Sequence, residues 1–167
     1  MSSPASLPLV LITGASQGIG RAVAQALASK HNYHVLLGVR NPHSGETVAA
    51  PLCDAGRQAS VVQLDLTSPT SIEAAIKDIQ TRFGYLDVLI NNAGIGITKS
   101  PYDLSLEEWD LVINTNLRGA FLCSRETARI MRRQRKGAIV NIASTRAFMS
   151  EPNTEAYAAT KGGLIAL

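Results

Sequence analysis

Residues 13–20 read Thr13-Gly14-Ala15-Ser16-Gln17-Gly18-Ile19-Gly20, a glycine-rich segment that indicates the fold more strongly than any other part of the chain. The segment follows an apolar run at 9–13 and leads into a stretch of helical periodicity at 19–29. Glycine at a strand-to-helix turn permits positive φ and a close approach of the backbone to a pyrophosphate. The start of the helix then offers free N–H groups to phosphate oxygens. An ordinary glycine turn is the alternative, but the flanking strand and helix favour a nucleotide-binding turn.

Short apolar runs alternate with longer amphipathic segments along the rest of the chain. The runs predict strands at residues 9–13, 34–39, 60–64, 86–91 and 138–142. The amphipathic segments predict helices at residues 19–29, 44–55, 69–82, 105–113 and 117–135, and another helix over 155–167. Ser68 before Pro69, and Ser105 with Glu108, are typical helix-start signals. The alternation predicts an α/β fold, a Rossmann-like doubly wound parallel sheet with helices on both faces.

Composition places the chain among ordinary globular proteins. It has 167 residues, of which 46% are hydrophobic and 17% charged, and this length can bury a full core. Because no linker or repeat interrupts it, we expect one dinucleotide-binding domain at 8–167 after an N-terminal tail at 1–7. Cys53 and Cys123 lack the spacing of metal ligands and predict free, buried thiols in a reducing compartment.

Several classes of partner are disfavoured. The net charge of +3 is not that of a nucleic-acid-binding protein, and the basic run at 129–136 is predicted to be a solvated helix end closed by Gly137. The histidines have irregular spacing without acidic or cysteine partners, so we expect no metal site. No apolar run approaches the 18 residues of a membrane span, and no signal peptide is recognisable. We therefore expect a cytoplasmic protein that contacts no membrane.

Two charged residues at predicted strand ends bear on the identity of the nucleotide. Arg40 follows the second strand, where an acidic residue would bind the ribose 2′-hydroxyl of NAD. A guanidinium at this position suits a 2′-phosphate, so NADP is favoured over NAD, with a solvated loop arginine as the alternative. Asp65 ends the third strand and either caps the next helix or accepts a hydrogen bond from an adenine amino group.

Six motifs in register resemble the short-chain dehydrogenase/reductase family: Gly14-x-x-x-Gly18-x-Gly20, Asp65, Asn91-Asn92-Ala93-Gly94, Asn116, Ser144 and Tyr157-x-x-x-Lys161. The resemblance extends from residue 8 to the last residue. It implies an NADP-dependent oxidoreductase that transfers hydride between nicotinamide and a carbonyl or alcohol carbon of a small molecule. The residues it implies in cofactor binding are Thr13, Gly14, Ser16, Gln17, Gly18, Ile19, Gly20, Arg40, Asp65, Leu66, Asn92, Ala93, Gly94, Tyr157 and Lys161.

The expected catalytic residues are Ser144, Tyr157, Lys161 and Asn116. Tyr157 and Lys161 are four residues apart, which places both side chains on one face of a helix. A phenol has an ordinary pKa of about 10, and a neighbouring ammonium favours the phenolate. Ser144 follows the fifth strand, where its hydroxyl can donate to a substrate oxygen as negative charge develops. The resemblance implies that Tyr157 is the acid/base, that Lys161 tunes it and holds the ribose, and that Asn116 holds a water linking the lysine to solvent.

The sequence departs from the family pattern after Lys161. The chain ends at Leu167, so we expect five strands where a two-half dinucleotide sheet has six or more, and an incomplete substrate pocket. The fifth strand would then be an apolar edge that favours association. A catalytically inactive relative that binds nucleotide weakly or acts only by association is one alternative, and a second chain that completes the sheet is another. A nucleotide-sugar epimerase or dehydratase is a distant one, disfavoured by the glycine spacing. A homodimer through 117–135 and 155 onward is implied by the resemblance, and the substrate is not identified.

Overall fold

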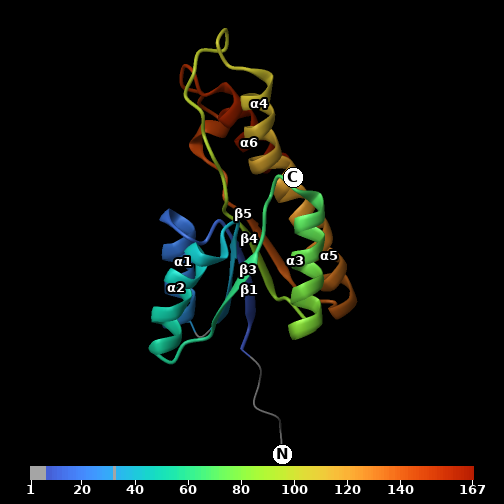
Figure 1. Ribbon diagram of the computed structural model, residues 1–167. Helices are drawn as coiled ribbons and strands as arrows, with labels where there is room; N and C mark the ends of the chain where they lie inside the picture. Colours follow the sequence, from blue (N-terminus) through green and yellow to red (C-terminus); the bar gives the residue numbers. More distant parts are fainter. Residues whose placement is uncertain (1–6, 32) are drawn as a thin grey trace, which may run out of the picture.

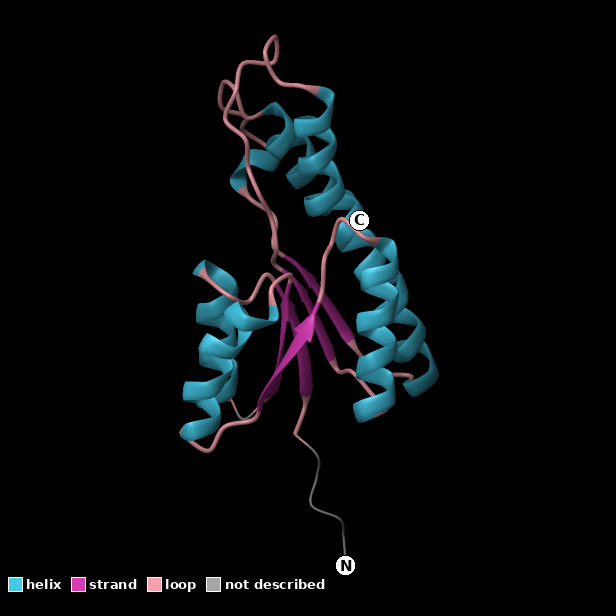
Figure 2. Cartoon of the chain, viewed as in Figure 1, coloured by secondary structure: helices cyan, strands magenta, loops and turns pink. Residues whose placement is uncertain are grey.

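A five-stranded parallel sheet forms the centre of the protein, with helices packed against both of its faces (Figures 1 and 2). The computed structural model describes residues 7–31 and 33–167. In chain order the strands are β1 (Leu9–Thr13), β2 (His34–Val39), β3 (Ala59–Gln63), β4 (Val88–Asn91) and β5 (Ala138–Asn141). Their spatial order is β3-β2-β1-β4-β5, so the chain reverses its direction of travel across the sheet between β1 and β4. This confirms the predicted doubly wound α/β fold, and such a reversal is where ligands bind in open α/β sheets.

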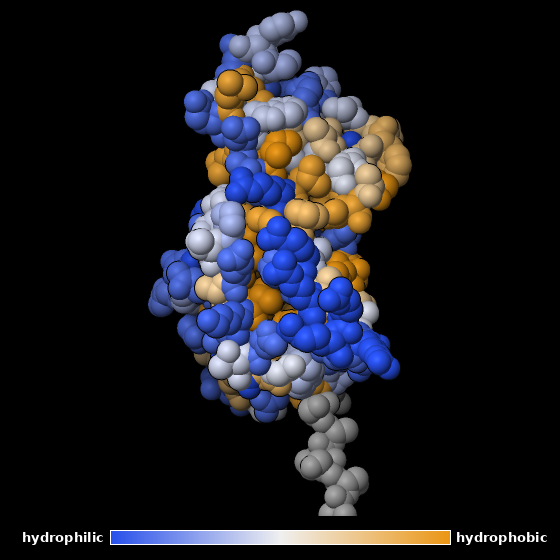
Figure 3. All heavy atoms as spheres, turned by 90° about the vertical axis from the view of Figure 1, so that its right-hand side faces the viewer, coloured by the Kyte–Doolittle hydropathy of each residue, from blue (hydrophilic) through white to orange (hydrophobic). Residues whose placement is uncertain are grey.

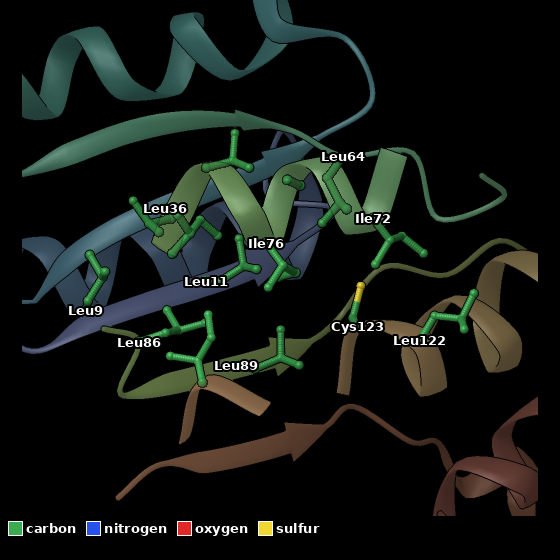
Figure 4. Close-up of a cluster of buried hydrophobic side chains, with 14 of the residues drawn as sticks. Leu9, Leu11, Leu36, Leu64, Ile72, Ile76, Leu86, Leu89, Leu122 and Cys123 are labelled. Carbon is green, nitrogen blue, oxygen red and sulfur yellow. The ribbon is translucent and has the colours of Figure 1, made fainter. Parts of the chain in front are cut away.

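The two faces of the sheet are covered by different helix pairs (Figure 1). Helices α1 (Gly18–Lys30) and α2 (Pro42–Asp54) lie on one face, and α3 (Pro69–Phe83) and α5 (Gly119–Gln134) lie on the other. Side chains of β1 alternate between the two cores, because successive strand residues point to opposite faces. Leu9 and Leu11 pack with Ile72 and Ile76 of α3 (Figure 4), whereas Val10 and Ile12 join the cluster beneath α1 and α2.

A smaller group of helices lies beyond the carboxyl ends of the strands (Figure 1). It contains α4 (Leu106–Ile113), the π-helical turn η1 (Asn114–Arg118), the short 3-10 turn η2 (Thr145–Ala147) and α6 (Glu155–Ala166). The helices predicted at 105–113 and 117–135 are therefore one continuous helical path, joined through η1. Ile113 and Gly119, the residues that bound the turn, both have right-handed helical backbone angles.

The predicted helix starts are confirmed in detail. Ser68 accepts a hydrogen bond from the N–H of Ser71, and Ser105 and Glu108 form a complete capping box. Helix α2 begins at Pro42, two residues before the prediction, because the side chain of Asn41 caps it and proline suits its first position.

Other boundaries also differ from expectation, and for two of them the structure shows the reason. The fourth strand begins at Val88 and not at residue 86, since the N–H and the carbonyl of Leu86 both bond the Gln134 side chain. Helix α5 ends on Arg135, which takes the left-handed cap conformation with φ of 53°, so Gly137 does not end the helix. The third strand also lies one residue earlier than predicted.

The surface over α3 and α5 is largely hydrophilic, and hydrophobic residues gather towards the end that carries α4 and α6 (Figure 3). The basic residues Arg129, Arg132 and Arg133 are exposed on α5, which agrees with a solvated helix end. At the sheet edge, Ile139 and Val140 of β5 are 38% and 42% exposed, so the predicted apolar edge is confirmed in this structure.

The two cysteines have different environments. Cys123 is buried, and burial raises the pKa of its thiol to about 12. Cys53 is exposed, so the expectation of two buried thiols is wrong for Cys53.

Three further predictions concern what the chain lacks or how it begins. Within residues 7–31 and 33–167, no helix is long and apolar enough to cross a membrane. The same residues contain no group of three or more His, Cys, Asp or Glu side chains that could hold a metal ion. The tail predicted at 1–7 lies, except for Leu7, outside the described residues.

Candidate active site

A cavity of about 760 Å³ opens at the carboxyl ends of the strands. All the predicted cofactor-binding residues except Gly20 line it, and so does Ser144. The predicted catalytic residue Asn116 does not line it. Ten further residues that the sequence patterns did not indicate also line the cavity: Gly38, Val39, Leu64, Thr67, Ile95, Gly96, Leu111, Thr115, Ile142 and Ala143. Most of these residues adjoin a motif, so adjacency in sequence could have found them, but Leu111 has no such neighbour.

Each glycine between the end of β1 and the first turn of α1 is needed for a different structural reason. Gly14 and Gly18 have φ of +68° and +53°, a region that glycine adopts without strain. A Cβ on Gly20 would lie 2.5 Å from both Asn92 Nδ2 and the carbonyl oxygen of Gly14, so Gly20 permits close packing and does not face the cavity. Gln17, which precedes α1, makes no side-chain cap bond, and the first N–H groups of the helix remain open to an anionic ligand.

Thr13 and Asn92 connect the glycine loop to the end of β4. The buried Thr13 Oγ1 accepts hydrogen bonds from the N–H groups of Asn92, at 3.1 Å, and Ala93, at 3.0 Å. Asn92 Nδ2 donates in return to the carbonyl oxygen of Thr13, at 2.9 Å. These bonds hold the backbone of Asn92 and Ala93 against the end of β1, beside the glycine loop.

Arg40 and Asp65 follow the ends of β2 and β3, and both line the cavity. Arg40 is exposed, and none of the ion pairs among the described residues involves it. Asp65 Oδ1 accepts from the N–H and the hydroxyl of Thr67, at 2.9 and 2.7 Å. Because Ser68 caps the following helix, Asp65 is not its cap, and that alternative is wrong.

Tyr157 and Lys161 meet on one face of α6, as their spacing predicts. Lys161 Nζ lies 5.4 Å from the centroid of the Tyr157 ring and donates to the carbonyl oxygen of Ile142, at 2.6 Å. Only 4% of Lys161 is exposed, and burial lowers the pKa of its ammonium group. Ser144 Oγ accepts from the N–H of Arg146, at 3.2 Å, which leaves its own hydroxyl hydrogen available to a ligand.

The π-helical turn directs Asn116 inward, where it is fully buried. Its Oδ1 accepts from the N–H of Ile95, at 2.8 Å. Its Nδ2 donates to the carbonyl oxygen of Ile95, at 2.8 Å, and to Thr160 Oγ1, at 3.2 Å. Both amide hydrogens are thus used within the protein, so a water held by this side chain would have to bind at Oδ1.

The burial of Lys161 makes stability depend on alkaline pH. Because its folded pKa is below the ordinary value of 10.5, the unfolded chain binds more protons at this site between the two values. Stability therefore rises with pH through that window. We expect the unfolding free energy of the protein, relative to Lys161→Met, to increase as pH approaches 10.5 in urea titrations at a series of pH values. A difference that stays constant or falls would contradict this environment for Lys161.

The protein is thus a doubly wound α/β protein in which a serine, a tyrosine and a lysine line the same cavity as the glycine loop. The family model for short chain dehydrogenase matches residues 8–167. The chain belongs to this family of oxidoreductases.

Named relatives and solved structures agree with that membership. An uncharacterised oxidoreductase of Thermotoga maritima is 40% identical over 159 residues, which are 95% of this chain and 62% of that protein. A 3-oxoacyl-(acyl-carrier-protein) reductase of Synechocystis is 36% identical over 94% of this chain and 64% of that protein. The crystal structure of a metagenomic short-chain oxidoreductase in complex with NADP matches with a TM-score of 0.90 at 33% identity, over 95% of this chain and 72% of that one. The chain thus spans less than two thirds of the length of these two curated relatives.

Proposed function

We propose that this chain is an NADP-dependent oxidoreductase that promotes hydride transfer between nicotinamide and a carbonyl or alcohol carbon, with Tyr157 as the acid/base. The observation that carries the proposal is the single cavity lined by the glycine loop, Arg40 and the group Ser144, Tyr157 and Lys161. Within this proposal, residues 8–167 act as one dinucleotide-binding domain.

The residues of the cavity fit NADP. The positive-φ glycines and the uncapped start of α1 suit a pyrophosphate, and a Cβ on Gly14 would lie 2.9 Å from Ala93 Cα. Arg40 offers a guanidinium to the 2′-phosphate, and Oδ2 of Asp65 is not among the acceptors used by Thr67. The solved relative in complex with NADP supports the same choice of nucleotide. When bound, the nicotinamide would supply or accept the hydride.

The chain's own groups would handle the proton and the developing charge. Tyr157 OH donates its proton to the substrate oxygen during reduction, or accepts one during oxidation. The positive charge of Lys161, held close to the Tyr157 ring, stabilises the phenolate left behind. The hydroxyl of Ser144 donates to the same substrate oxygen and orients it. Lys161 itself is held by the Ile142 carbonyl oxygen, so its ammonium has a fixed direction.

We infer a small carbonyl or alcohol substrate, and the name of the Synechocystis relative makes 3-oxoacyl thioesters reasonable first compounds to assay. A homodimer through α5 and α6 is the assembly we propose. Phe121, 45% exposed on α5, and Ile165, 50% exposed on α6, are apolar residues available to such a contact. A second chain that completes the sheet is the alternative assembly.

The role of Arg40 is tested by nucleotide preference. Arg40→Ala should weaken NADPH binding about ten- to a hundredfold, because a hydrogen bond to a charged group contributes roughly 1.5–3 kcal/mol. NADH affinity should be nearly unchanged, since NADH lacks the 2′-phosphate. The measurement is a fluorescence titration of both nucleotides, with Arg21→Ala as the control, because Arg21 is also an exposed arginine but does not line the cavity. An equal loss for NADH and NADPH would refute this role.

The second candidate function is a catalytically inactive relative that binds nucleotide weakly or acts only by association, for which Ile139 and Val140 of β5 are exposed apolar residues. NADPH binding without turnover on any carbonyl compound, together with no effect of Tyr157→Phe, would support that candidate against the enzyme.

A further inference from the structure

Thr160 carries a buried hydroxyl group and lies in sequence between Tyr157 and Lys161, two residues of the proposed catalytic group. It lies on α6, is 0% exposed and does not line the cavity. Its Oγ1 donates to the carbonyl oxygen of Tyr157, at 2.7 Å, and accepts from Asn116 Nδ2, at 3.2 Å. A side chain that only filled space here would not need a hydroxyl.

The bonds of Thr160 complete a chain that joins three separate segments. The chain begins at the backbone of Ile95, which exchanges two hydrogen bonds with the Asn116 amide. It continues from Asn116 to the hydroxyl of Thr160 and ends on the backbone of Tyr157. Ile95 lies in the segment that follows β4, Asn116 lies in the π-helical turn, and Tyr157 lies on α6. Each of these segments also contributes residues to the cavity.

The energetics favour a specific role for this chain of bonds. Buried hydrogen bonds in series strengthen one another, and removing one partner leaves a buried polar group unsatisfied. A π-helical turn is rare and needs support from its surroundings. Asn116 receives that support from Ile95 on one side and from Thr160 on the other. Without the hydroxyl of Thr160, one hydrogen of the Asn116 amide would face an apolar group.

We propose that Thr160 is a positioning residue. It fixes the position of Tyr157 and Lys161 relative to Ile95, in the segment of the cavity wall that follows β4. This inference rests on the proposed function for its kinetic consequence. Thr160 itself touches no reacting atom. It acts through the carbonyl oxygen of Tyr157 and through the Asn116 amide, so that α6 keeps a fixed register against the π-helical turn.

The test compares Thr160→Val, which keeps the shape and removes the hydroxyl, with Thr160→Ser, which keeps the hydroxyl. Thr127→Val is the matched control, because Thr127 is also 0% exposed on a helix, and its Oγ1 has no hydrogen-bond partner among the described residues. We expect Thr160→Val to lower kcat about ten- to a hundredfold, the order expected for misplaced catalytic groups, with a smaller change in KM for NADPH. Thr160→Ser should recover most of kcat, and Thr127→Val should leave it unchanged.

A second readout does not depend on turnover. In protein carrying ¹³C-labelled tyrosine, with Tyr157→Phe used for assignment, Thr160→Val should shift the ring resonance of Tyr157, because the ring then lies differently relative to the ammonium of Lys161. Thr160→Ser should keep the original resonance. If the unaltered chain has no turnover, the proposed function fails and the position of this resonance alone tests Thr160.

Two results would overturn the inference: a Thr160→Val protein with the original Tyr157 resonance and, in an active chain, the original kcat, or a Thr160→Ser protein as impaired as Thr160→Val. If Thr160→Val does not fold, Thr160→Ala, which leaves room for a water beside Asn116, replaces it in the same comparison.

Discussion

Tyr157→Phe is expected to lower kcat for NADPH-dependent carbonyl reduction by about a hundred- to ten-thousandfold, the range that general acid–base catalysis contributes. The affinity for NADPH should change far less. Phenylalanine keeps the ring that lies 5.4 Å from Lys161 Nζ, and removes only the hydroxyl that carries the proton. Steady-state rates and nucleotide fluorescence titrations on the same preparation separate the two effects.

Tyr102 provides the matched control for this change. It is 97% exposed and does not line the cavity, so Tyr102→Phe removes a phenol of the same kind from the surface. An equal, small effect of the two substitutions on kcat would exclude Tyr157 as the acid/base and favour the inactive candidate.

Gly20→Ala is expected to cause the largest loss of stability. The added Cβ would lie 2.5 Å from Asn92 Nδ2 and from the carbonyl oxygen of Gly14, and the latter is backbone that cannot rotate away. Overpacking of this kind costs about 1–3 kcal/mol, and it would also displace the glycine loop. We therefore expect a lower midpoint of urea unfolding together with weaker NADPH binding.

Gly162→Ala is the control for a glycine-to-alanine change within a helix. A Cβ at Gly162 would lie 3.9 Å from the carbonyl oxygen of Ala147, an ordinary van der Waals contact, so the methyl group fits. Alanine has the higher helix propensity, by up to about 1 kcal/mol, and Gly162→Ala should match or exceed the original stability. A Gly20→Ala protein as stable as Gly162→Ala would show that the loop does not pack as described.

Local patterns were enough to predict most of the fold. The glycine spacing at 14, 18 and 20 predicts a turn whose backbone angles and close contacts need glycine, and the structure shows both features. The caps at Ser68 and Ser105 could also be predicted, because a helix start is determined by residues within one turn. Most of the cavity wall follows from the same patterns, since parallel strands bring their carboxyl ends to one edge.

Features that depend on contacts between distant residues could not be predicted in this way. The π-helical turn is stabilised by Ile95 and Thr160, which are far from Asn116 in sequence. The late start of β4 results from Gln134, on a helix that follows it. The left-handed cap at Arg135 was missed for another reason: nearby Gly137 has the residue type that usually takes this conformation.

The most direct test of the central claim is the fate of the hydride. The 167-residue chain would be incubated with NADPH that carries deuterium at both hydrogen positions of nicotinamide C4 and with a 3-oxoacyl thioester, a ketone and an aldehyde in turn, and the products analysed by mass spectrometry. We predict deuterium on the former carbonyl carbon of at least one product, and its loss in Tyr157→Phe. Bound NADPH without deuterium in any product would contradict the claim that this cavity performs hydride transfer.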